Sequence, residues 1–252
     1  MIREAPLAVR MVVLGLCMAL PTACEVSSAT TVDGDNGGDR LIGTPRDDTM
    51  RGFAGDDYIE ALAGDDRIEG MDGQDTMIGG EGRDDIDGGE DTDHAYGGSG
   101  IDQVVGLGDA DWLYGEDDPD ALVGGEGDDR LYAGGGGGTA SGGAGKDEVV
   151  GGPGRDRLDG EADDDRVVAG PGDDRLEGGK GSDLLDGEDG DDSLFGQLGQ
   201  DVMRGGNGDD FVDAVDEIPG EAVDCGAGSN DIAQVDKGDE LTNCETIRVL
   251  ED

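Results

Sequence analysis

The chain has 252 residues, 52 of them glycine, and a formal net charge of −47, with only 34% hydrophobic and 3% aromatic residues. Nucleic acid and anionic membrane surfaces would repel a chain this acidic, which excludes both as partners and favours a cation. So few apolar side chains also exclude an ordinary globular core, so an ordered fold needs a structural repeat or a bound ligand.

Residues 1–24 are predicted to be a secretory signal, because a basic start is followed by the apolar run Met11 to Leu20, which is too short for a permanent membrane span. Cys24 follows a small residue and resembles the bacterial lipoprotein processing site, although Pro21 stands where that family favours Leu. Cys24 is therefore a candidate for lipidation, and ordinary cleavage after Ala29 is the alternative. In both cases we expect an extracellular or cell-surface protein that contacts a membrane only through a lipid anchor.

Residues 25–33 are polar and without pattern, which predicts a tether. From Gly34 to Asp213 the chain then reads as 20 rows of nine residues without an insertion or deletion. Column eight is aliphatic or Met in every row, and column six is Asp in 19 rows, with Gly138 as the exception. The consensus is G-G-x-G-x-D-x-U-x, where U is apolar. The column-six aspartates are Asp39, Asp48, Asp57, Asp66, Asp75, Asp84, Asp93, Asp102, Asp111, Asp120, Asp129, Asp147, Asp156, Asp165, Asp174, Asp183, Asp192, Asp201 and Asp210.

This consensus is similar to the nonapeptide repeat of the hemolysin-type (RTX) calcium-binding proteins, and the resemblance covers about 180 of the 252 residues. The row that spans residues 79–87 matches it at every defined column. The resemblance implies an all-β fold, a parallel β-roll or solenoid in which two rows form one coil, so that 20 rows give about ten coils. We expect a short x-U-x strand in each row, with U inside and glycine turns between strands.

The resemblance also implies that calcium ions lie between turns of successive coils on the same side, so that row n pairs with row n+2. Column-six carboxylates and backbone carbonyls are the expected ligands, because calcium takes six to eight oxygen atoms and tolerates irregular geometry better than magnesium. Twenty rows leave up to 18 such gaps, and 18 ions would nearly neutralise the −37 that 13 basic and 50 acidic residues give the repeats. We expect folding to be triggered by calcium outside the cell. The alternative is that Asp only caps turns in a metal-free solenoid or a disordered chain, but Asn or Ser would serve there and neither occurs in column six.

Two departures from the consensus affect this hypothesis. The row at residues 133–141 has no carboxylate, which predicts weak calcium binding and a soft joint near the middle. In four other rows the column-four glycine is replaced by an aspartate whose role is open between a calcium ligand and a turn former. These residues are Asp91, Asp109, Asp118 and Asp163.

Residues 214–252 lose the nine-residue spacing and are predicted to form a C-terminal cap. Cys225 and Cys244 enclose a loop of about 20 residues in this segment. In an exported protein we expect these two cysteines to form a disulfide bond.

Nothing in the sequence predicts an enzyme. The single histidine, His94, falls in an outward column, and no protease, hydrolase or P-loop motif is present. On one face, column nine places Tyr96, Tyr114 and Tyr132 one above another. This face could bind a protein or glycan partner or a second copy of the chain, or the rings could simply stabilise the stack. We therefore expect a calcium-binding structural or interaction module, and the alternative is an accessory or remnant of an RTX toxin or enzyme.

Overall fold

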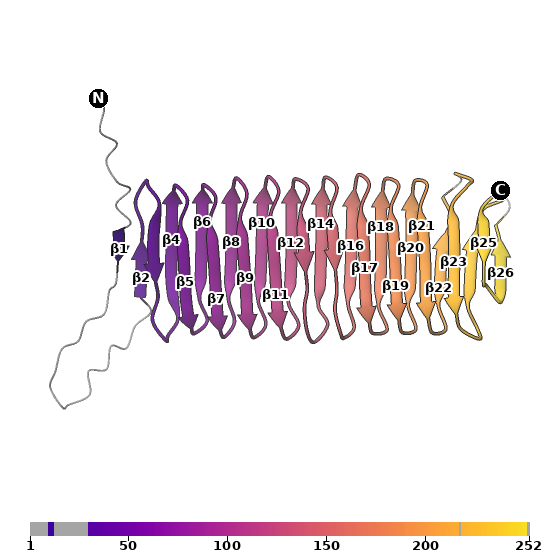
Figure 1. Cartoon of the computed structure of the whole chain (residues 1–252), viewed down its shortest axis with the longest axis horizontal. Coiled ribbons are helices and arrows are strands. Elements are labelled where there is room, and N and C mark those ends of the chain that lie inside the picture. The colour runs from indigo at the N-terminus through magenta and orange to yellow at the C-terminus, as the bar shows by residue number, and fades with distance from the viewer. Residues whose placement is uncertain (1–9, 13–29, 217, 251–252) are drawn as a thin grey trace, which may run out of the picture.

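The computed structural model describes residues 10–12, 30–216 and 218–250, which form a rod of stacked coils (Figure 1). Odd-numbered strands form one sheet of 13 strands and even-numbered strands a second sheet of 13, and the pairs are parallel throughout. The fold is thus the expected all-β parallel β-solenoid, with about 12 turns and no helix among the described residues. Accordingly, the described part of the chain contains no helix with the length and apolar character that a membrane span needs.

The first sheet contains the odd strands in chain order. They are β1 (Arg10–Val12), β3 (Asp39–Ile42), β5 (Tyr58–Ala63), β7 (Thr76–Glu81), β9 (His94–Ser99), β11 (Trp112–Asp117), β13 (Arg130–Tyr132), β15 (Glu148–Val150), β17 (Arg166–Pro171), β19 (Leu184–Asp189), β21 (Val202–Asn207), β23 (Ala222–Ala227) and β25 (Glu240–Thr242). The second sheet contains the even strands, also in chain order. They are β2 (Thr30–Asp33), β4 (Asp48–Ala54), β6 (Arg67–Asp72), β8 (Asp85–Glu90), β10 (Gln103–Gly108), β12 (Ala121–Glu126), β14 (Thr139–Ala144), β16 (Arg157–Ala162), β18 (Arg175–Lys180), β20 (Ser193–Leu198), β22 (Phe211–Ala214), β24 (Ile232–Val235) and β26 (Thr246–Val249).

Within the repeats, each strand pairs with the next strand but one along the chain, as Leu113 pairs with Leu131 and Leu122 with Ala140. Like columns therefore stack along the rod. Every column-eight side chain, from Leu41 to Val212, is buried, and together these side chains form the centre of one continuous apolar core. This confirms the expected inward column.

Most strands are longer than the expected three residues. A typical strand, such as β7, has six residues and continues from column seven through column three of the next row. The strand continues because the column-one residue, usually glycine, is buried and faces the core. The column-two residue has a positive φ, but the backbone hydrogen bonds between strands continue past it. Column two does not need glycine for this, since Phe53, Leu62 and Met71 have φ angles of 79°, 86° and 83°.

The solenoid extends beyond both ends of the expected repeat segment. Strand β2 lies in the residues expected to be a tether, and Val32 is 1% exposed and pairs with the column-eight residue Met50. In the tail, strands β23 to β26 continue both sheets, so the segment expected to be a separate cap is built as further coils. Most of the expected signal sequence, including Cys24, lies outside the described residues; the three described there form β1, which pairs with β3.

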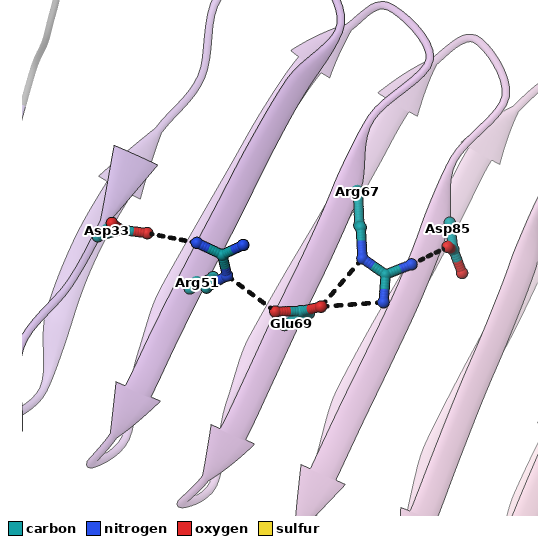
Figure 2. A network of polar contacts seen from close by, with 5 residues as sticks. All are labelled: Asp33, Arg51, Arg67, Glu69 and Asp85. Atoms are coloured by element: carbon teal, nitrogen blue, oxygen red, sulfur yellow. Dashed lines mark hydrogen bonds and ion pairs between the residues drawn. The ribbon is translucent and has the colours of Figure 1, made fainter. Parts of the chain in front are cut away.

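The outer faces of the two sheets differ in chemistry. On the second sheet, Arg51 contacts Asp33 and Glu69, and Arg67 contacts Glu69 and Asp85, which gives a chain of ion pairs across four strands (Figure 2). Burial of Glu69 opposes its ionisation, but hydrogen bonds from the two arginines lower its pKa overall. These side chains tie adjacent coils together on the outside of the rod.

On the first sheet, the expected tyrosine stripe is present. The rings of Tyr96 and Tyr114 stack with centroids 4.8 Å apart, and those of Tyr114 and Tyr132 with centroids 5.0 Å apart. In the neighbouring column, the His94 ring stacks on Trp112, and the Arg130 guanidinium lies 4.8 Å from the centroid of the Trp112 ring. The single histidine is thus accounted for by packing.

Candidate metal sites in the repeat turns

The column-six aspartates lie at the turn just before each strand, with their side chains inside the rod. All 19 are at most 7% exposed, and Asp93 and Asp111 are fully buried. Burying this many carboxyl groups is unfavourable unless hydrogen bonds or cations compensate for the lost water. The partners of each carboxylate oxygen therefore decide what the turns can bind.

One oxygen of each carboxylate is used within the fold. The Asp93 N–H donates to Oδ1 of Asp111 at 2.8 Å, and the Asp75 N–H donates to Oδ1 of Asp93 at the same distance. The pattern repeats from coil to coil along both edges of the rod. In the row where glycine replaces the aspartate, the backbone still donates: the Gly138 N–H donates to Oδ1 of Asp156 at 2.7 Å. These bonds position every carboxylate and tie each coil to the next.

The second oxygen, Oδ2, is buried without a hydrogen-bond partner in 17 of the 19 aspartates. The two exceptions are at the N-terminal end, where Oδ2 of Asp39 accepts the Asp35 N–H at 2.7 Å and Oδ2 of Asp48 accepts the Thr44 N–H at 2.6 Å. Buried carboxylate oxygens almost always have a partner in folded proteins. A regular row of free ones therefore points to a ligand that supplies positive charge.

For 13 of the 17 free oxygens, a backbone carbonyl and the free oxygen crowd the same column-one glycine. A Cβ atom placed on Gly79 would lie 2.3 Å from Oδ2 of Asp84 and 2.6 Å from the carbonyl oxygen of Gly97. The same crowding is found at Gly187, where Oδ2 of Asp192 and the carbonyl oxygen of Gly205 would both lie 2.4 Å from the added atom. Glycine in column one thus leaves room for two oxygen atoms of the kind that calcium binds.

Burial raises the pKa of 17 of these aspartates above the ordinary value of 3.8, as for Asp57, Asp102, Asp156 and Asp201. For Asp93 the hydrogen bond from Asp75 opposes this effect, and the charges of Asp75 and Asp111 add to it. The pKa is raised to about 8 for Asp93 and Asp165, to about 7 for Asp66, Asp75, Asp111, Asp120, Asp147 and Asp192, and to about 6 for Asp84, Asp129, Asp174, Asp183 and Asp210. A metal-free rod therefore disfavours their negative charge near neutral pH.

Side chains alone do not form a finished metal cage. Among the described residues, no three acidic, histidine or cysteine side chains converge on one metal position. The carbonyl oxygens beside column one must then supply part of any coordination sphere, in keeping with the mixed oxygen ligands that calcium accepts.

The four aspartates in column four have the backbone conformation of turn residues. Asp91, Asp109, Asp118 and Asp163 have φ angles of 73°, 65°, 72° and 78°. Aspartate tolerates this left-handed conformation better than most residues. They therefore stand in for glycine as turn residues.

The carboxylate-free row at residues 133–141 lies between two short strands of the first sheet. Strands β13 and β15, on either side of it in the first sheet, are only three residues long. The space left beside Gly138 and Thr139 is part of a surface pocket of about 460 Å³ that Arg155 and Arg157 also line. Arg155 pairs with Asp173, and Arg157 with Glu177.

In the tail, four further acidic residues take the place of column six, which the sequence analysis missed. Glu221, Asp231, Asp239 and Glu245 directly precede β23, β24, β25 and β26. On one edge the ladder continues through Asp231 and Glu245, since the Asp210 N–H donates to Oδ1 of Asp231 at 2.8 Å and the Asp231 N–H donates to Oε2 of Glu245 at 3.1 Å. The sequence pattern that could have identified these four residues is an acidic residue two positions before an apolar one. The pattern recurs at irregular intervals along the tail, unlike the nine-residue repeats.

The expected disulfide joins Cys225 in β23 to Cys244, just before β26, with their Cα atoms 5.1 Å apart. Cys225 is fully buried in the core. The disulfide therefore links the two final coils.

Comparison with known proteins identifies the repeats. A family model described as the RTX calcium-binding nonapeptide repeat, four copies, matches residues 33–68, 60–95, 69–104, 96–131, 105–140, 141–176, 168–203 and 177–212, which together cover residues 33–212. No curated protein matches the chain. The matched family is one of calcium-binding repeats and not an enzyme family. From the matched rows and the buried column of aspartates, the chain belongs to the RTX calcium-binding repeat family, whose repeats bind calcium ions.

Proposed function

We propose that the column-six aspartates are the calcium ligands of this chain, and that calcium binding drives its folding into an extracellular or cell-surface structural module. The observation that carries the proposal is the row of buried Oδ2 atoms without hydrogen-bond partners. At 13 of the 17 turns, a backbone carbonyl oxygen lies beside the same column-one glycine as the free Oδ2 atom. A divalent cation between coils would satisfy both atoms and offset the charge of the carboxylates.

The same geometry sets an upper limit on the number of ions. If each ion lies between a row and the next row but one, the 20 rows offer up to 18 gaps. The two gaps beside Gly138 lack one of their carboxylates and should bind weakly or remain empty. Ions in the remaining gaps would neutralise most of the negative charge of the repeats.

Calcium-triggered folding follows from the energetics of these turns. The unfolded chain has no preformed site, so calcium binds the folded rod much more tightly and shifts the equilibrium toward it. Cytosolic calcium is low, whereas extracellular modules bind calcium with dissociation constants of roughly 0.1 to 1 mM. The chain would therefore remain unfolded until export by its N-terminal signal, with Cys24 as a candidate lipid anchor.

The experiment compares two substitutions in one turn. Asp93→Asn removes a proposed ligand. Asp91→Asn is the control: it removes the same charge two residues earlier, from a turn residue whose positive φ Asn also tolerates. Native mass spectrometry in calcium should show one or two fewer ions for Asp93→Asn and no change for Asp91→Asn. Equal ion counts in the two variants would contradict the assignment of column six, and a wild-type protein without bound calcium would contradict the proposed function itself.

The tyrosine stripe is the proposed interaction surface of the module. Tyr96, Tyr114 and Tyr132 present stacked rings on the outside of a rod that is otherwise strongly acidic. Such a surface suits a protein or glycan partner or a second copy of the chain. Tyr114→Ser should abolish self-association, measured by analytical ultracentrifugation, or retention on a glycan array, while calcium binding stays intact. Loss of folding alone would show that the rings only stabilise the stack.

A further inference from the structure

The link between β22 and β23 differs from every turn of the repeats. Seven residues separate β22 from β23, of which 215, 216 and 218–221 are described, whereas β7 and β8 are separated by three residues. Val202 pairs with Leu184 on one side and with Ala222 on the other, so the coil that contains the link is longer than a repeat coil by two positions. The link lies outside the segment that the family model matches, which ends at residue 212.

Glu221 ends this link at the place of a column-six residue. It is 0% exposed, and neither of its carboxylate oxygens has a hydrogen-bond partner. In the repeats, by contrast, one oxygen of each aspartate accepts a backbone N–H from the preceding coil, as Asp201 does from Asp183 at 2.9 Å. Glu221 therefore has two free buried oxygens where a repeat aspartate has one.

Asp201, one coil earlier on the same edge, supplies a third free oxygen. It is 1% exposed, and its Oδ2 atom has no hydrogen-bond partner. The three atoms nearest to a Cβ atom added to Gly196 include no backbone carbonyl, as is also the case for Gly142 beside Asp147. A Cβ atom on Gly196 would meet Oδ2 of Asp201 at 2.4 Å and next the Cε atom of Met203 at 3.1 Å.

Two further carboxylates are held near Glu221 by the backbone. Oδ1 of Asp239, in the following coil, accepts the N–H groups of Gly220 at 2.9 Å and Glu221 at 3.4 Å. Asp216, within the link, accepts the Gly199 N–H at 2.9 Å and the Ile218 N–H at 2.6 Å. These bonds hold the carboxylates of Asp239 and Asp216 against described residues of the link.

Burial raises the pKa of Glu221 to about 9, and the charges of Asp239, Asp216, Asp201 and Asp236 add to the effect in that order. A fully buried acid in this setting is stable either as a neutral group or beside a cation. A neutral carboxylic acid would leave its O–H donor and both oxygens unsatisfied, whereas a cation would satisfy both oxygens.

We propose that Glu221 and Asp201 bind a calcium ion at the link between β22 and β23, a site outside the nonapeptide repeats that holds the last two coils on the rod. Backbone oxygens or water complete the coordination, as calcium commonly accepts. Together with the disulfide between Cys225 and Cys244, the ion would fasten β23 to β26 against fraying. The proposal shares Asp201 with the proposed repeat sites and otherwise rests on residues of the tail.

The test compares Glu221→Gln with Glu240→Gln, which removes the same charge from an exposed side chain in β25. Native mass spectrometry in calcium should show one ion fewer for Glu221→Gln and the wild-type count for Glu240→Gln. Trypsin cleavage after Lys237, which lies between β24 and β25, gives a second measurement. At calcium ten times the dissociation constant, loss of the site should speed this cleavage about tenfold, because binding protects by the factor 1 + [Ca²⁺]/Kd.

The outcomes separate this proposal from the proposed function. A wild-type chain that binds no calcium overturns both. Repeats that bind calcium, with an equal ion count in Glu221→Gln and the wild type, overturn only the link site. If circular dichroism shows that Glu221→Gln has lost its strands, the ion count is measured on Glu221→Asp instead. Glu221→Asp places the column-six residue of the repeats at this position and should bind as many ions as the wild type. Loss of an ion from a folded Glu221→Asp rod would overturn the proposal.

Discussion

Acidification should fold this protein in the absence of calcium, which is the opposite of ordinary acid denaturation. In the calcium-free rod, burial raises the pKa of Asp93 and Asp165 to about 8 and that of several other aspartates to about 6 or 7. An unfolded aspartate has a pKa of about 3.9. Because the folded pKa is raised, the contribution of each group to stability is fully present below about pH 4 and is lost as the pH rises through 6 to 8.

The size of the effect follows from a single residue. Asp111 has a folded pKa of about 7, against 3.8 as its ordinary value. Linkage then gives a loss of stability on the order of 4 kcal/mol between acidic pH and pH 7. The whole net stability of a typical domain is about 5 to 15 kcal/mol. Two or three such aspartates are therefore enough to unfold the calcium-free rod at neutral pH.

The assay is far-ultraviolet circular dichroism on protein that has been treated with a chelator and desalted. We expect a strand spectrum at pH 5 and its cooperative loss between pH 6 and 8. The range stops above the sequence isoelectric point of 4.1, where precipitation would interfere. Calcium added at pH 8 should restore the strands and should have little effect at pH 5, because protons already neutralise the carboxylates. A calcium-free protein that is equally folded at pH 5 and pH 8, or that unfolds on acidification, would refute the reasoning.

Three substitutions test the packing of the rod. Gly79→Ala places a methyl group 2.3 Å from Oδ2 of Asp84 and should destabilise the calcium-loaded protein by about 1 to 3 kcal/mol in urea unfolding, whereas no loss would show that the turn can relax. Leu113→Ala empties a fully buried core position and should lower the free energy of unfolding by about 2 to 5 kcal/mol, whereas Leu107→Ser, at a position 48% exposed, should change it by less than about 0.5 kcal/mol. Cys244→Ser removes a disulfide with a sequence separation of 19 and should cost about 3 kcal/mol, with faster hydrogen exchange confined to the last coils; faster exchange along the whole rod would contradict a local role.

The repeat segment could be predicted from the sequence because a solenoid is a one-dimensional stack. Once column eight is assigned to the interior, the pairing of Leu113 with Leu131, two rows later, follows without knowledge of any distant contact. The burial of every column-eight residue follows from the same periodicity. The position of the aspartates follows as well, since column six lies two residues before an inward side chain.

The tail could not be predicted in this way because its coils vary in length. The pairing of Phe211 with Ile232 closes a coil longer than any in the repeats, whereas the pairing of Ile232 with Thr246 closes a shorter one. A search for a period of nine therefore finds nothing after Asp213. What is retained is the local pattern of an acidic residue before an inward apolar one, as in Glu221 before Val223, which only the paired strands make recognisable.

The hydrogen-bond partners of each carboxylate oxygen also could not be predicted from the sequence. In Asp93, Oδ1 accepts a backbone hydrogen bond from Asp75, whereas Oδ2 has no hydrogen-bond partner. A pattern of aspartates can indicate calcium, but it cannot show that half of each carboxylate already belongs to the backbone. That division leaves one free oxygen in 17 of the 19 aspartates, so the proposed calcium sites would need carbonyl ligands as well.

This division of labour explains why column six holds aspartate and not asparagine. The Oδ1 atom of an asparagine would accept the same N–H that Asp93 donates to Asp111, and its neutral amide would avoid the electrostatic penalty of a buried carboxylate. Its NH₂ group would also donate toward the carbonyl that crowds Oδ2 in turns such as that of Asp84 and Gly97. An asparagine ladder would thus hold the coils together without a metal. Column six contains no asparagine and 19 aspartates, so the chain gives up metal-independent stability at every turn. In the proposed function a cation takes the place of the missing donors, and the fold would then depend on calcium at each of these turns.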